Sequence, residues 1–166
     1  MSDSRTVTVS RVFDAPIDLV YRAWTEPEHI ANWMKCDPEA TMDVAAWEPR
    51  VGGAIAYHMF KPGVFEARTT GRVVEADPPR AFAFTTDPNP ELGAPELTIR
   101  IALAEVDGRT ELTLTHSGLP TDEFCGIVEG GWSVSLELLR DVVVALVGAY
   151  ASARMSSSPE RRGEGS

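Results

Sequence analysis

Two neighbouring segments with alternating apolar and polar residues constrain the fold of this chain more than any other feature. LTIRIALAEV (97–106) and RTELTLTH (109–116) flank Asp107-Gly108, a dipeptide preferred in two-residue type I′ hairpin turns. Counting outward from the turn predicts these pairs: Val106 with Arg109, Leu103 with Leu112, Ile101 with Leu114 and Ile99 with His116. Because the apolar sides of both strands coincide in this register, we predict an antiparallel hairpin with His116 on its apolar face.

Five further segments have the composition and length of β-strands. They are residues 6–13, 41–47, 54–60, 65–76 and 81–86. Gly71 lies inside the longest of them and predicts a kink there. The segment 87–96, DPNPELGAPE, holds three prolines and a glycine, so we predict a loop.

Three segments carry apolar residues at helical spacing. Pro16 begins the first, whose stripe continues to Trp24. The second, TEPEHIANWM (25–34), has Thr25 and Glu28 at the spacing of a capping box. The third is predicted over 122–150 and has a broad apolar stripe: Val128, Trp132, Ser135, Leu136, Leu139, Val143 and Leu146.

The predicted order is β-α-α-β(6)-α, with strands and helices in separate parts of the sequence. That order favours an α+β fold with an antiparallel sheet. Six consecutive strands joined by short turns are expected to curve, and the long last helix is the one predicted element large enough to cover their apolar face. We predict a single domain over 6–150, with flexible tails at 1–5 and 151–166.

Charge and hydropathy exclude several classes of partner. The net charge of −10 disfavours binding to phosphate backbones, so we expect no nucleic-acid partner. No apolar run approaches the ~20 residues of a membrane helix, so no membrane insertion is expected. The N-terminal residues MSDSRTVTVSR lack an apolar signal-peptide core, which favours a cytoplasmic location.

The sequence contains no motif for a metal or a cofactor. Cys36 and Cys125 are far apart, and His29, His58 and His116 form no metal-binding spacing. The glycines of EPRVGG follow neither the dinucleotide-binding nor the phosphate-loop pattern. We therefore expect neither metal nor cofactor.

Four motifs in this order resemble the SRPBCC superfamily, also called the START-like or birch-pollen-allergen-like helix-grip fold: TEPEHIANWM, EPRVGG, VVEADPPRAFAFT and LTLTHSGLP with EGGWSVSLELL. Within it, the chain is most similar to the branch named for homology to the activator of the heat-shock-protein-90 ATPase. The resemblance implies a curved antiparallel sheet wrapped around the C-terminal helix. It does not imply one function, because this fold hosts lipid carriers, hormone receptors, cyclases and co-chaperone domains.

The same resemblance implies an apolar cavity between the sheet and the last helix. Candidate lining residues are Tyr57, Met59, Phe65, Phe82, Phe84, Trp132 and Leu136, with Trp33, Met34 and Trp47 near an entrance. The alternative interpretation is that each of these side chains belongs to the core. Many relatives have a second tryptophan where this chain has Met34, and often a polar or acidic residue where it has Trp47. A relative's specificity is therefore not transferable.

His116 is the candidate polar group of this cavity. It could anchor the junction between sheet and helix, contact a ligand, or act as an acid or base. The structural interpretation is preferred, because THSGLP recurs among relatives with different ligands. His58 and Glu66, on neighbouring strands, are the other acid–base candidates, and Ser135 lies on the inward stripe of the last helix.

Three functions follow from these observations. The leading one is the binding of a small apolar or aromatic molecule in the cavity. The first alternative is an enzyme of the cyclase, dehydratase or hydrolase type acting there. The second is a protein-interaction role as a chaperone ATPase activator. An exposed edge strand also leaves a weak homodimer open.

Overall fold

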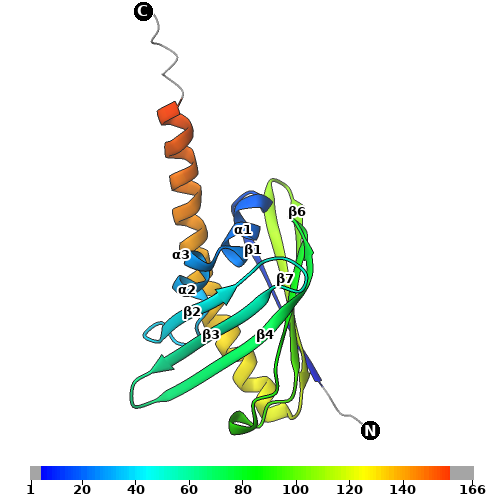
Figure 1. Ribbon diagram of the computed structural model, residues 1–166. Coiled ribbons are helices and arrows are strands. Elements are labelled where there is room, and N and C mark those ends of the chain that lie inside the picture. Colours follow the sequence, from blue (N-terminus) through cyan, green and yellow to red (C-terminus); the bar gives the residue numbers. More distant parts are fainter. Residues whose placement is uncertain (1–4, 158–166) are drawn as a thin grey trace, which may run out of the picture.

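The computed structural model describes residues 5–157, and its centre is one seven-stranded antiparallel sheet (Figure 1). The order of the strands in the sheet is β1-β7-β6-β5-β4-β3-β2. Their bounds are β1 Arg5–Phe13, β2 Thr41–Trp47, β3 Ala54–Lys61, β4 Phe65–Asp77, β5 Ala81–Thr86, β6 Leu97–Val106 and β7 Arg109–Leu119. The predicted α+β class, the strand order along the chain and the helix-grip arrangement are confirmed.

The hairpin of β6 and β7 has the predicted register. All four predicted pairs occur, including Ile99 opposite His116. Asp107 and Gly108 both have positive φ, 53° and 79°, as a type I′ turn requires. On its other side β7 pairs with β1, which places Val7 opposite His116. His116 therefore lies between two apolar side chains on neighbouring strands.

Two short helices connect β1 to β2. They are α1 (Ile17–Thr25) and α2 (Pro27–Trp33). The predicted capping box is wrong: Glu26 is the residue before α2, and no side chain caps that helix. Thr25 is the last residue of α1, and its hydroxyl donates to the Tyr21 carbonyl one turn earlier, at 2.9 Å. Thr25 thus belongs to α1, and Glu26 occupies the position before α2.

The long helix α3 (Asp122–Ser157) crosses the concave side of the sheet and extends past it (Figure 1). It continues to Ser157 instead of ending near residue 150. No glycine or proline occurs between Gly148 and Pro159, and alanines favour helix there. The predicted tails at 1–5 and 151–166 fall largely outside the described residues, namely at 1–4 and 158–166.

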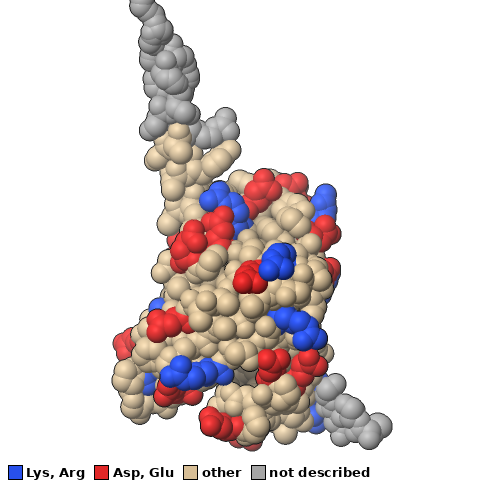
Figure 2. Space-filling model, in the orientation of Figure 1, with Lys and Arg blue, Asp and Glu red and all other residues tan. Residues whose placement is uncertain are grey.

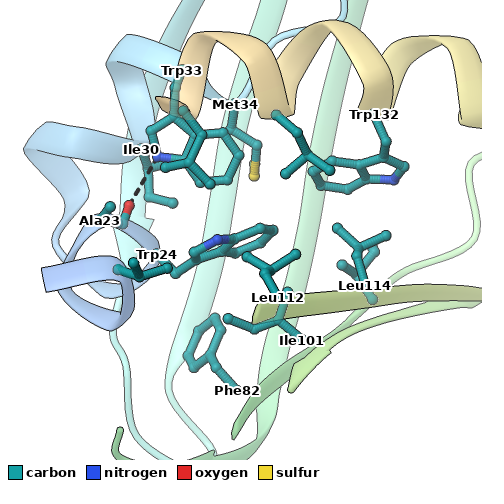
Figure 3. Close-up of a cluster of buried hydrophobic side chains, with 14 of the residues drawn as sticks. Ala23, Trp24, Ile30, Trp33, Met34, Phe82, Ile101, Leu112, Leu114 and Trp132 are labelled. Atoms are coloured by element: carbon teal, nitrogen blue, oxygen red, sulfur yellow. Dashed lines mark hydrogen bonds between the residues drawn. The ribbon is translucent and has the colours of Figure 1, made fainter. Parts of the chain in front are cut away.

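The middle of the fold is a cluster of buried aromatic and aliphatic side chains (Figure 3). Trp24 of α1 lies against Trp33 of α2, with ring centroids 4.6 Å apart, and stacks on Trp132 of α3 at 5.8 Å. The Trp33 indole donates to the Ala23 carbonyl at 2.9 Å, which ties α2 to α1. Leu112, Leu114, Ile101 and Phe82 cover the cluster from the sheet.

Within residues 5–157, no helix is both long enough and apolar enough to span a membrane. Acidic and basic side chains are interspersed over the face of the molecule in Figure 2.

Candidate ligand-binding site

A pocket of about 830 Å³ lies beside the N-terminal end of α3. Its walls come from β3, β4, the end of β5, β6, β7, the first turn of α3 and the β5–β6 loop. Figure 1 shows this loop, which contains the short helix η1 (Pro90–Leu92), next to the first turns of α3. The pocket thus lies at the end of the sheet where α3 begins.

The pocket exists because β4 is paired on only one side over its first half. β4 pairs with β3 from Phe65 onward, whereas its pairing with β5 begins at Gly71. The β5–β6 loop lies along the stretch that β5 leaves uncovered. It is held there by the Asp87 backbone N–H, which donates to the Thr70 carbonyl at 2.8 Å, and by the Thr70 hydroxyl, which donates to the Asp87 carboxylate at 2.7 Å.

The inner wall of the pocket is apolar with a few neutral polar groups. Leu97, Ile99 and His116 are buried, and Phe124 and Tyr57 are half-buried. Ala67, Thr69 and Thr86 complete this wall. Burial raises the pKa of the Tyr57 phenol to about 12, so its hydroxyl stays protonated at neutral pH.

The rim of the pocket carries the charges. Glu66, Arg68, Asp87 and Glu91 line it and are all exposed. Glu66 and Arg68 pair with each other at 3.2 Å. Three carboxylates against one guanidinium give the rim a negative character.

His116 is the one residue of the inner wall with an unusual bonding pattern. Its side chain is buried, with 8 % of its surface exposed. The Trp132 indole N–H donates to Nδ1 at 2.9 Å, whereas Nε2 has no partner among the described residues. Burial lowers the pKa of His116 to about 4, so the ring is neutral at pH 7.

Of the eleven residues predicted to contact a ligand, two line this pocket, Tyr57 and His116. Met59 and Phe65 are half-buried and do not line it. Seven are buried and lie outside its lining: Trp33, Met34, Trp47, Phe82, Phe84, Trp132 and Leu136. These seven side chains belong to the hydrophobic core cluster, and their contact with a ligand stays a prediction.

Aromatic side chains pack against one another between the sheet and the helices. Trp24 was not among the predicted site residues, yet it is fully buried and contacts both Trp33 and Trp132. Trp47 packs on Phe84 with ring centroids 5.1 Å apart, and its indole donates to the Trp24 carbonyl at 3.1 Å. All four tryptophans of the chain thus lie between the sheet and the helices.

The remaining candidate polar residues have separate contacts. His58 lies 2.8 Å from Glu66 and stacks on Phe60, and it does not line the pocket, whereas Glu66 does so at the rim. The Ser135 hydroxyl donates to the Lys35 carbonyl at 2.6 Å, which ties α3 to the segment between α2 and β2. Ser135 thus has a structural contact and does not line the pocket.

The sequence analysis missed Thr69, Thr86, Phe124 and the β5–β6 loop as pocket residues. Phe124 precedes Val128 by four residues, so extending the apolar stripe of the last helix by one turn would have included it. Alternation along β4 could have identified Thr69, which lies on the same side as Phe65 and Ala67, whereas Thr70 lies on the side of Glu66 and Arg68.

A group of possible metal ligands lies at the start of α2. Ligand atoms of Glu26, Glu28 and His29 are all within 4.8 Å of one another. Glu26 is already paired with Arg22 at 2.9 Å and with His29 at 3.0 Å. Among the described residues, this group is best understood as a surface ion-pair network.

Comparison with known proteins identifies similar chains. Residues 14–143 match the model of the family described as Activator of Hsp90 ATPase homolog 1-like protein. Protein CV1439 from Chromobacterium violaceum is 27 % identical, with a TM-score of 0.75 over 83 % of this chain and 96 % of its own. An AHSA1-like protein from Aeromonas hydrophila is 21 % identical, with a TM-score of 0.71 over 87 % of this chain and 94 % of its own.

A third solved structure, CalU16 from Micromonospora echinospora, is 21 % identical, with a TM-score of 0.63 over 93 % of this chain and 85 % of its own. At 21 % identity these last two similarities concern the fold alone. No curated protein matches the chain.

Proposed function

This chain belongs to the Activator of Hsp90 ATPase homolog 1-like family, and from that premise we propose that it binds a small, largely apolar molecule in the pocket beside the N-terminal end of α3. The fold of this family commonly holds hydrophobic ligands. The observation that carries the proposal is the pocket of about 830 Å³ with an apolar inner wall and a polar rim. Small-molecule sites typically have this size and this distribution of polarity.

The chemistry of His116 supports binding over acid–base catalysis at this position. In a neutral imidazole, one nitrogen carries the proton and the other has the lone pair. The lone pair of Nδ1 accepts the Trp132 N–H, so it is not available to remove a proton from a substrate. The cyclase, dehydratase or hydrolase alternative thereby loses its first candidate base. The chaperone-activator alternative has the family description as its support.

The proposal can be tested by filling the pocket. Ala67 lines the inner wall, and Ala54 is an exposed alanine on the paired strand β3 that does not line it. We expect Ala67→Phe to weaken binding of the neutral dye Nile red at least about tenfold, a loss of about 1.4 kcal/mol. Ala54→Phe, the matched control, is expected to bind the dye as the original protein does.

Native mass spectrometry of the freshly purified protein gives a second readout. A co-purified molecule in the pocket would appear as extra mass that is lost on denaturation, and Ala67→Phe would lack it. Equal saturable binding of Nile red by both alanine variants would contradict the proposed site. No saturable binding by the unaltered protein would contradict the proposed function.

A further inference from the structure

His116 presents a buried hydrogen-bond donor that nothing in the described chain accepts. Its Nδ1 faces Trp132, which does not line the pocket, whereas His116 itself does. Because Nδ1 already accepts the Trp132 indole, Nε2 is the ring nitrogen that remains for a ligand of this pocket. That atom is inaccessible to solvent and without a partner among the described residues.

The tautomer of His116 follows from the chemistry of its partner. An indole nitrogen only donates, so Nδ1 must accept and cannot carry a proton in this arrangement. The single proton of the neutral ring then lies on Nε2. Trp132 thus converts His116 into a fixed donor directed away from the helix.

An unmet buried donor destabilises the folded protein, and a ligand acceptor at this point would relieve that cost. A carboxylate is a poor candidate for the acceptor. The residues around His116 on the inner wall include Leu97, Ile99 and Phe124, none of which is cationic. An anion placed there would lose its hydration without gaining a counter-charge, and the carboxylates of Glu66, Asp87 and Glu91 at the rim would repel it.

We propose that His116 recognises the carbonyl oxygen of a neutral, otherwise apolar ligand through Nε2–H, with Trp132 as the positioning residue that fixes this tautomer. The inference rests on the proposed function and adds the chemical class of the ligand. Ile99 and Phe124 would contact the apolar body, and the rim would disfavour anions.

The experiment compares two probes of similar shape, benzophenone and diphenylmethane, which differ in one carbonyl group. Their dissociation constants are measured by titration followed by NMR. The unaltered protein is expected to bind benzophenone about tenfold more tightly, the usual effect of one buried hydrogen bond. Bound benzophenone is also expected to show a carbonyl stretching frequency lower than in an apolar solvent.

Three variants test whether the preference for benzophenone depends on His116. In His116→Phe the preference is expected to disappear, and in His116→Gln, which retains a donor and an acceptor, it is expected to persist in part. Thr115→Val is the matched control, because Thr115 is next to His116 on β7 and does not line the pocket. This control is expected to keep the full preference.

Trp132→Phe tests the positioning role through a spectroscopic signature. Imidazole nitrogen shifts of the unaltered protein are expected to report protonated Nε2 at pH 7, and Trp132→Phe is expected to give a mixture of tautomers. This measurement on the unaltered protein does not depend on whether His116→Phe folds.

The outcomes separate the two proposals. If neither probe binds the unaltered protein, the proposed function fails for molecules of this size. If both probes bind equally, the pocket remains a binding site and the role of His116 is refuted. A proton on Nδ1, or a preference that survives in His116→Phe, would refute it as well.

Discussion

The behaviour of His116 depends on Trp132, a neighbour that the sequence does not place beside it. Its position in line with Leu112 and Leu114 was predictable from alternation, and β7 pairs it with Val7 and Ile99 as well. Its bond to Trp132 of α3 was not predictable, because the two residues lie on different elements. The preferred interpretation, an anchor between sheet and helix, agrees with this bond, and ligand contact stays a prediction.

At the residue scale, we predict that His116 makes the stability of the protein depend on pH. Its folded pKa of about 4 lies below the ordinary value of 6.5. Between these two values the unfolded chain binds the proton more readily, so acid favours unfolding. The contribution of neutral His116 to the free energy of unfolding is about 3 kcal/mol. It is fully present above pH 6.5 and is lost as the pH falls from 6.5 through 4.

Urea denaturation at several pH values between 7 and 4 checks this prediction, with His116→Gln as the reference. Asp37 and Glu75, whose pKa values are lowered by hydrogen bonds and ion pairs, also lose stabilisation in acid, but equally in both proteins. The difference between the two proteins therefore isolates His116. Parallel pH profiles would show that the ring is not buried as described.

At the scale of elements, two glycines of the sheet are required for different reasons. Gly108 has a φ of +79° and open space around it, so only its backbone conformation constrains the residue. Gly71 lies where β4 starts to pair with β5. A Cβ added at Gly71 would lie 1.9 Å from the Thr85 carbonyl oxygen, and no rotamer change relieves a clash with backbone.

We predict that Gly71→Ala destabilises the protein more than Gly108→Ala does. The turn variant is expected to cost about 1 kcal/mol, the penalty of a left-handed conformation with a Cβ. The strand variant is expected to cost about 3 kcal/mol, because β4 and β5 must separate. Urea denaturation measures both free energies of unfolding. A larger loss for Gly108→Ala would contradict the close approach of these two strands.

At the scale of the whole molecule, α3 belongs to the fold over only part of its length. Val143 is buried, whereas Val144, Gly148 and Tyr150 are exposed. Figure 1 shows the C-terminal part of α3 extending beyond the sheet. A domain ending at residue 150 stays a prediction, although the helix itself continues to Ser157.

Truncation tests that boundary. A chain ending at Tyr150 is expected to keep its free energy of unfolding within about 0.5 kcal/mol, because residues 151–153 are exposed. The matched truncation, ending at Asp141, removes the buried Val143 and is expected to lose about 2 kcal/mol or more. Both values come from urea denaturation. A large loss from the first truncation would extend the domain to the end of the described helix.

The sequence by itself determined the strands, the β6–β7 register, the order of the elements and the resemblance to a family. These features depend on neighbours a few residues apart: a turn dipeptide, a two-residue alternation and a helical stripe. The end of α3 was harder to predict, because no local stop signal follows Gly148 before Pro159.

Only the tertiary structure decided where the pocket lies and what faces it. Local pattern tells which side of a strand or helix a residue occupies, but not which distant side chains fill the same volume. Trp24 of α1 and Trp132 of α3 stack on each other in the core, although they are distant in sequence. The first half of β4, which is paired on one side only, and the β5–β6 loop leave space at one end of the fold. Sequence patterns describe residues that are near one another along the chain, whereas a pocket is formed by residues that are distant in sequence.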